Sequence, residues 1–289
     1  MSIYHRNIIS FLILCGSVFY VTAADAGTWW GKARDPLKNI AYGTDNLQKL
    51  DIYLPLGSKI KKRPVHIFVH GGAWTIGDKK RFTKHAELNT KNGIIFVSIN
   101  YRLSPKNVHP AQVEDCARAV KWVYDHIGAY GGDANNIHIS GHSAGAHLSV
   151  LLGTQPSYLA AYGLPLSVLK TIISVDTASY DFTTPPTGKG VRVLPKIIDK
   201  TFGTSIAQLK AASPLFHVNS KNAPRFMMFV TSERPDAVAQ TTVFNKALIN
   251  VGTHSTMQVI QGLSHGEMGQ AMGEPNSPIA QGILKAILN

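Results

Sequence analysis

The sequence predicts an α/β fold in which a mostly parallel central sheet is covered by helices on both faces. Three observations predict it. The 289 residues are 44% hydrophobic and 16% charged, which suits one large core in a single domain. Short apolar runs alternate along the chain with longer segments of helical periodicity. Runs such as residues 65–69 (VHIFV) are apolar throughout, as in strands buried on both faces.

The expected elements follow this alternation in chain order. The apolar positions of the first expected helix, including Cys116, recur at helical spacing, so we expect this thiol to pack in the core. Residues 176–222 form a long irregular stretch, which we interpret as a lid-like insertion or pocket wall. Strands are expected at 50–54, 65–69, 94–99, 136–140, 171–175, 225–230 and 256–260, and helices at 110–127, after Ser143, at 236–250 and at 278–288.

The N-terminus has the pattern of a secretory signal peptide. His5 and Arg6 precede an apolar run too short to span a bilayer comfortably, and small residues follow. Cleavage after Ala23 or Ala26 would leave an exported, periplasmic or secreted domain of residues 27–289 with no integral membrane span. Since Cys15 leaves with the signal, Cys116 would be the one cysteine of the mature chain, and no intrachain disulfide could form.

The net charge of +12 raises the possibility of a nucleic-acid partner. The basic residues are spread along the chain, with local clusters only at 59–63 and 79–81, and no nucleic-acid-binding motif accompanies them. We therefore expect no nucleic-acid partner. The sequence leaves the oligomeric state open.

The segment at 141–145 (GHSAG) matches the pattern of a nucleophile elbow. An expected strand precedes it, an apolar run of helical length follows it, and glycine stands two positions to either side of Ser143. Glycine at these positions lets the backbone turn sharply and present the hydroxyl above the sheet. Ser143 is therefore the candidate nucleophile.

Donors for an oxyanion are expected from two places. Gly71 and Gly72 follow a buried strand, and their amides can approach a substrate where a side chain would block it. The amide of Ala144 directly follows the nucleophile. These three residues are the expected oxyanion hole.

The base must be one of the twelve histidines, and His265 is our choice. It follows the last expected strand, which brings it to the carboxyl edge of the sheet where the elbow also emerges. The orienting acid should follow the strand at 225–230, where Asp236 is preferred and Glu233 remains open. No histidine belongs to a metal-ligand pattern, so we expect no metal and no other cofactor.

With these residues in view, the chain resembles the carboxylesterase branch of the α/β-hydrolase superfamily, near hormone-sensitive-lipase-like esterases and kynurenine-formamidase-like enzymes. The resemblance implies a single α/β-hydrolase domain, the triad Ser143, Asp236 and His265, and a small-molecule ester or formamide substrate. The loop at 232–236 (SERPD) departs from the family pattern and keeps Glu233 open. The motifs that carry the resemblance are HGGAW at 70–74, NYRLSP at 100–105, GGDANNIHISGHSAGAHL at 131–148 and GLSHGE at 262–267.

The leading interpretation is an exported serine hydrolase that cleaves small to medium acyl esters through an acyl-enzyme. An arylformamidase or amidase with the same triad is the alternative, although a signal peptide is unexpected for a cytosolic tryptophan-catabolic formamidase. A binding module on a hydrolase scaffold is the rival from another class, since a fold does not fix a function. An aromatic-lined acyl pocket is expected from Trp74, His142, Tyr180 and Phe182.

Overall fold

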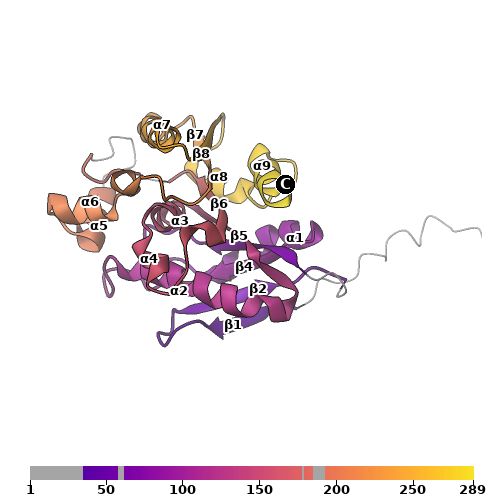
Figure 1. Ribbon diagram of the computed structural model, residues 1–289. Helices are drawn as coiled ribbons and strands as arrows, with labels where there is room; N and C mark the ends of the chain where they lie inside the picture. Colours follow the sequence, from indigo (N-terminus) through magenta and orange to yellow (C-terminus); the bar gives the residue numbers. More distant parts are fainter. Residues whose placement is uncertain (1–34, 58–61, 178, 185–192) are drawn as a thin grey trace, which may run out of the picture. The chain divides into compact units, whose positions relative to one another are not determined.

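The structure is a computed structural model, and it describes residues 35–57, 62–177, 179–184 and 193–289 (Figure 1). The expected signal peptide, residues 1–26, lies outside the described residues. Its cleavage and the export of the domain therefore stay predictions.

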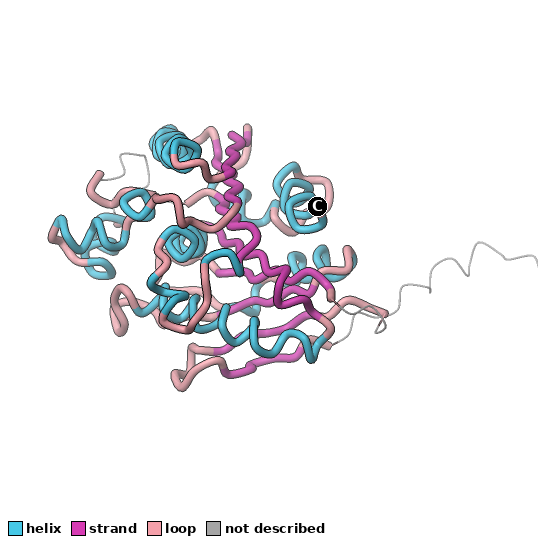
Figure 2. Tube along the Cα trace, in the orientation of Figure 1, coloured by secondary structure: helices cyan, strands magenta, loops and turns pink. Residues whose placement is uncertain are grey.

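Eight strands form one sheet in the order β1-β2-β4-β3-β5-β6-β7-β8. Every neighbouring pair from β4 to β8 is parallel. The two pairs at the other edge, β1 with β2 and β2 with β4, are antiparallel. Figure 2 shows the strands, in magenta, running through the middle of the domain between the helices. The strands are β1 (Leu37–Ala41), β2 (Lys49–Tyr53), β3 (Arg63–Val69), β4 (Ile95–Ile99), β5 (Gly132–His142), β6 (Leu169–Val175), β7 (Arg225–Thr231) and β8 (His254–Ile260).

Helices cover both faces, so the predicted fold class is confirmed. On one face α2, α3 and α7 contact the sheet and share its larger apolar cluster. On the other face α1, α8 and α9 pack on a second cluster. The helices are α1 (Thr83–Lys91), α2 (Ala111–His126), α3 (Ala144–Thr154), α4 (Ser157–Ala160), α5 (Leu194–Phe202), α6 (Ile206–Ala212), α7 (Pro235–Asn250), α8 (His265–Ala271) and α9 (Pro278–Leu288), with short 3₁₀ turns between some of them.

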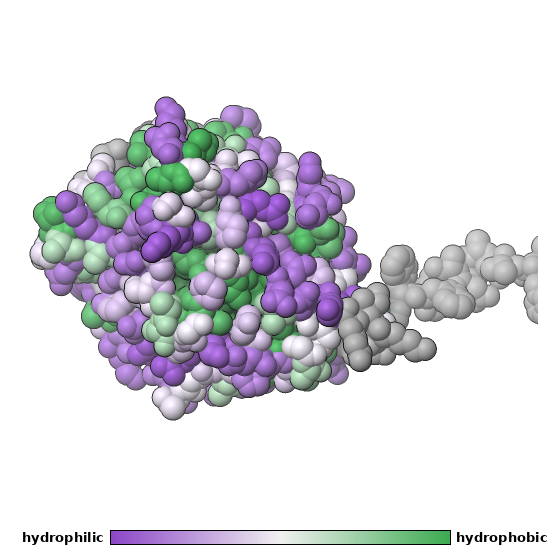
Figure 3. All heavy atoms as spheres, in the orientation of Figure 1, coloured by the Kyte–Doolittle hydropathy of each residue, from purple (hydrophilic) through white to green (hydrophobic). Residues whose placement is uncertain are grey.

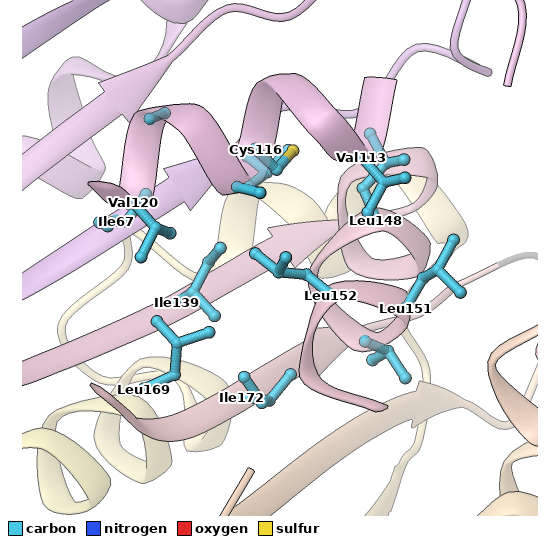
Figure 4. Packing of buried hydrophobic residues seen from close by; sticks show 14 of the residues in the cluster. Ile67, Val113, Cys116, Val120, Ile139, Leu148, Leu151, Leu152, Leu169 and Ile172 are labelled. Carbon is cyan, nitrogen blue, oxygen red and sulfur yellow. The ribbon is translucent and has the colours of Figure 1, made fainter. Parts of the chain in front are cut away.

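The larger apolar cluster lies where α2 and α3 meet β3, β5 and β6 (Figure 4). In this view Leu148 of α3 lies beside Val113 of α2, and Leu152 of α3 lies nearer to Ile139 of the sheet. Full burial of each such side chain contributes about 1.5–3 kcal/mol. Cys116 of α2 is fully buried in this cluster, which confirms that its thiol packs in the core.

The insertion at 176–222 is more regular than its composition indicated. Its described residues include α5, α6 and a 3₁₀ turn at Pro214–His217. The helix α5 is amphipathic, because Ile198 and Phe202, four residues apart, are both buried against the core. The prediction of an irregular stretch is wrong here, since these apolar residues recur at helical spacing.

The surface seen in Figure 3 mixes hydrophilic side chains with small groups of hydrophobic ones. Ile76, at 67%, is the most exposed of the large hydrophobic side chains among the described residues. It lies at the rim of the cavity described below. In the part of the chain that the structure describes, no helix combines the length and the apolar composition needed to cross a membrane.

Candidate active site

Ser143 occupies a sharp turn between the end of β5 and the start of α3. Its φ of 57° and ψ of −120° lie in a region that non-glycine residues rarely adopt. A Cβ on Gly145 would lie 2.0 Å from the Val69 carbonyl oxygen, and one on Gly141 would lie 2.2 Å from the Gly145 carbonyl carbon. Only glycine fits at both positions, which explains the spacing of the motif around the strained serine.

His265 is the first residue of α8 and faces Ser143. Its Nε2 lies 3.0 Å from the Ser143 Oγ, and its Nδ1 lies 2.5 Å from the Asp176 Oδ2. A carboxylate accepts but cannot donate, so the Nδ1–H donates to Asp176 and Nε2 keeps a lone pair for the serine hydroxyl. The three side chains can therefore pass a proton from Ser143 to His265.

Asp176 was not among the sequence candidates for the acid, and the preference for Asp236 is wrong. Asp236 lies in the first turn of α7, and neither it nor the exposed Glu233 bonds to His265. Asp176 directly follows β6, which pairs with the elbow strand β5 as well as with β7. The signal that could have found it is the position of an aspartate immediately after the apolar run at 171–175.

The surroundings of Asp176 keep its carboxylate charged. Burial by itself raises the pKa of this carboxyl, but the His265 hydrogen bond and the Arg234 charge outweigh it and leave the pKa below its ordinary value. Arg234 Nη1 lies 3.1 Å from Oδ2, and the Thr231 amide donates to Oδ1 at 3.2 Å. This carboxylate is therefore ionised at neutral pH, as a group that orients a histidine base has to be.

The predicted oxyanion residues stand beside the nucleophile. A Cβ on Gly71 would lie 2.9 Å from the His142 carbonyl oxygen and 3.2 Å from the Ser143 Cβ, so this loop runs directly against the serine turn. Gly72 has a φ of 119°, and a Cβ there would lie 2.0 Å from the Ile76 carbonyl oxygen. Ala144 begins α3, and the first amides of a helix have no acceptor within the helix. These amides are suited to receive negative charge near Ser143.

A cavity of about 530 Å³ opens at Ser143 and His265. His142 lines it, as expected, together with the apolar side chains of Ile76, Phe82 and Ile197. Ile197 belongs to α5, so the insertion contributes a residue to the cavity wall.

Trp74, Tyr180 and Phe182 do not line this cavity, so their assignment to the pocket is wrong. Trp74 is 1% exposed, donates its indole N–H to His147 Nδ1 at 3.2 Å and packs edge-on against Phe182. Tyr180 stacks on Phe244 with ring centres 4.4 Å apart. Burial of these large rings stabilises the core, and they lie among core side chains instead of at the substrate.

His142 supports the catalytic histidine candidate. Its Nε2 lies 2.8 Å from the His265 carbonyl oxygen, and the two rings are 4.6 Å apart. Burial and then the neighbouring His265 lower the pKa of His142 to about 4. His142 is therefore neutral at pH 7, donates through Nε2–H, and adds no charge beside the base.

The sheet order, the strained serine after a central parallel strand and the histidine after β8 define an α/β-hydrolase. The described residues bring together no group of three or more potential metal ligands. It stays a prediction that the reaction of this protein needs no metal and no other cofactor.

The chain belongs to the BD-FAE family, whose model matches residues 50–248. It is 33% identical over 225 residues to esterase LipQ of Mycobacterium tuberculosis, covering 73% of this chain and 51% of that protein. It is 32% identical over 202 residues to esterase LipC of the same organism, covering 66% of this chain and 49% of that protein. The chain thus spans about half the length of these two relatives.

Solved structures agree on the fold. A truncated form of a carbohydrate esterase from gut microbiota superposes with a TM-score of 0.72 at 20% identity, covering 89% of this chain and 96% of that one. Esterase 2 of Thermogutta terrifontis superposes with a TM-score of 0.66 at 22% identity, covering 85% and 90%. At these identities the likeness shows the α/β-hydrolase fold.

Proposed function

We propose that this protein is an exported serine carboxylesterase that cleaves small to medium acyl esters. The observation that carries the proposal is the chain of contacts from Ser143 Oγ through His265 to the ionised Asp176, at a cavity of about 530 Å³. The names of the relatives LipC and LipQ, both esterases, support ester hydrolysis. The signal-like N-terminus supports export.

The proposed reaction proceeds through an acyl-enzyme. Ser143 Oγ attacks the ester carbonyl carbon while His265 Nε2 takes the hydroxyl proton, and the amides of Gly71, Gly72 and Ala144 donate to the oxyanion. The intermediate collapses, the C–O bond to the alcohol breaks, and His265 returns the proton to the leaving oxygen. Water, deprotonated by His265, then attacks the acyl carbon. The bond to Oγ breaks while His265 returns the proton to Oγ, which releases the acid and restores Ser143.

A panel of chromogenic acyl esters tests this function. Wild type should cleave them, and Ser143→Ala should lose at least about 10⁴-fold in kcat at an unchanged melting temperature. Activity retained in Ser143→Ala would refute the serine mechanism.

The acyl-length series tests the size of the substrate. In a confined cavity each methylene that does not fit costs roughly 1–3 kcal/mol, so acetyl to hexanoyl esters should react faster than lauroyl esters. N-formylkynurenine belongs in the same panel. A rate that rises steadily past ten carbons would refute the size preference, and formamide turnover above every ester would favour a formamidase.

A further inference from the structure

We propose that Arg234 is a positioning residue for this hydrolysis, whose guanidinium holds the Asp176 carboxylate against His265 and opposes uptake of a further proton by this pair. The inference rests on the proposed function. It concerns a residue in the loop after β7, where the sequence led us to expect an acid.

Three groups meet at one carboxylate oxygen. Asp176 Oδ2 lies 2.5 Å from His265 Nδ1 and 3.1 Å from Arg234 Nη1, and the two nitrogens are 3.2 Å apart. With its proton directed at Asp176, Nδ1 cannot accept from the guanidinium, so two donors share a single acceptor. Arg234 therefore holds in place the Asp176 Oδ2 that accepts the hydrogen bond from His265.

The loop that carries Arg234 is anchored on both sides. The Thr231 amide donates to Asp176 Oδ1 at 3.2 Å, and the Glu233 amide donates to the Thr231 hydroxyl at 3.2 Å. Pro235 then begins α7. The Arg234 side chain is 21% exposed, and the Asp176 side chain is fully buried. This ion pair is thus screened by solvent less than a surface pair.

The positive charge of Arg234 acts in the same sense on Asp176 and on His265. It stabilises the buried carboxylate, whose isolation from water would otherwise favour protonation, and it repels a positive charge on the adjacent imidazole. The other titratable groups nearby are the neutral His142 at the end of β5, the exposed Glu233, Asp236 of α7 and Glu267 of α8, whose carboxylate bonds to Ser264. In the described residues Asp176 forms ion pairs with Arg234 and His265 alone.

The pH dependence of catalysis tests the proposal. We would measure kcat and KM between pH 4.5 and 9 for a short-chain ester with wild type, Arg234→Met, Arg234→Gln and Arg234→Lys. Loss of the charge should move the acidic limb of kcat/KM upward by about one pH unit in the Met and Gln variants. The Lys variant should keep most of the wild-type limb. The plateau kcat should fall in Arg234→Met with little change in KM, because Arg234 does not line the cavity at Ser143.

Arg102→Met is the matched control. Arg102 pairs with the fully buried Asp115 at 2.7 Å and is 23% exposed, closely similar to Arg234. Breaking either pair should lower the melting temperature, but only the Arg234 variants should shift the pH profile. An unshifted limb in Arg234→Gln, or an equal shift in Arg102→Met, would overturn the proposal.

Proton NMR separates this inference from the proposed function. The low-field resonance of the His265 Nδ1 proton reports its hydrogen bond to Asp176 without substrate, and this resonance should shift upfield in Arg234→Gln, because the carboxylate is held less firmly. If wild type hydrolyses no ester in a Ser143-dependent way, the proposed function fails while this resonance still tests Arg234. An unchanged resonance together with Ser143-dependent hydrolysis contradicts only the role of Arg234.

Discussion

Ser143 combines exposure to the cavity with a backbone conformation that costs about 1–3 kcal/mol. Two backbone hydrogen bonds hold Ser143. Its amide donates to the Val175 carbonyl at 3.0 Å, and its carbonyl accepts from the His147 amide at 3.1 Å. The strained turn directs the hydroxyl toward His265 Nε2, which lies 3.0 Å away. At the scale of the residue, the geometry of the site therefore depends on neighbouring backbone as much as on the proposed triad.

Replacement of the acid tests the assignment of Asp176. Asp176→Asn should reduce kcat by about 10⁴-fold with little change in KM, because an amide can donate to Nδ1 and favour the wrong tautomer of His265. Asp236→Asn is the matched variant and should stay within a few-fold of wild type. Steady-state kinetics with one short-chain ester compares kcat of the two variants. A larger loss in Asp236→Asn than in Asp176→Asn would identify Asp236 as the acid.

At the scale of the element, close contact between α3 and the end of β3 sets the direction in which the elbow faces. Gly145 allows this contact, since its Cα approaches the Val69 carbonyl too closely for a methyl group. This glycine, two positions after Ser143, thus serves packing between elements as well as the turn itself.

Gly145→Ala should destabilise the protein by about 1–3 kcal/mol and lower kcat, because α3 must move away from β3. Gly128→Ala is the control, since a Cβ at Gly128 meets nothing within 4 Å. Thermal unfolding and ester kinetics of the two variants should separate them. A wild-type melting temperature in Gly145→Ala would show that the helix tolerates the shift.

His265 owes its placement to the first turn of α8. Ser264 caps this helix, and Ser264 and Glu267 form a capping box. Ser264→Ala should cost about 1 kcal/mol of stability and lower kcat several-fold, because the turn that carries the imidazole loosens. Glu267→Gln retains a side chain that can complete the capping box, so its stability and kcat should stay near those of wild type. Equal kcat in all three proteins would mean that capping does not position His265.

At the scale of the whole molecule, buried and half-buried neutral histidines link folding to pH. Burial is the main cause that lowers their pKa values to about 3 or 4, from an ordinary value of 6.5. Between these values the unfolded chain binds protons that the folded chain excludes. The residues are His66, His70, His85, His109, His138, His142 and His147.

The free energy of unfolding should therefore fall as the pH drops below 6.5 toward 4, by up to about 1.4 kcal/mol per pH unit for each histidine. Melting temperatures measured from pH 8 to 4 check this. His85→Gln should flatten the dependence, whereas the exposed His254→Gln should leave it unchanged. A melting temperature constant down to pH 4.5 would contradict the linkage.

The sequence by itself determined the alternation of strands and helices, the glycines around Ser143 and the position of His265 after the last strand. These features depend on local periodicity and on turn chemistry, which a single sequence records. Only the tertiary structure decided that Asp176, instead of Asp236, meets His265, and that Trp74, Tyr180 and Phe182 pack in the core. The physical reason is that the contacts of these residues depend on which strand ends and loops lie side by side in the folded chain. The order of strands in the sheet brings Asp176 from β6 and Arg234 from the loop after β7 to one histidine, although 58 residues separate them in the chain.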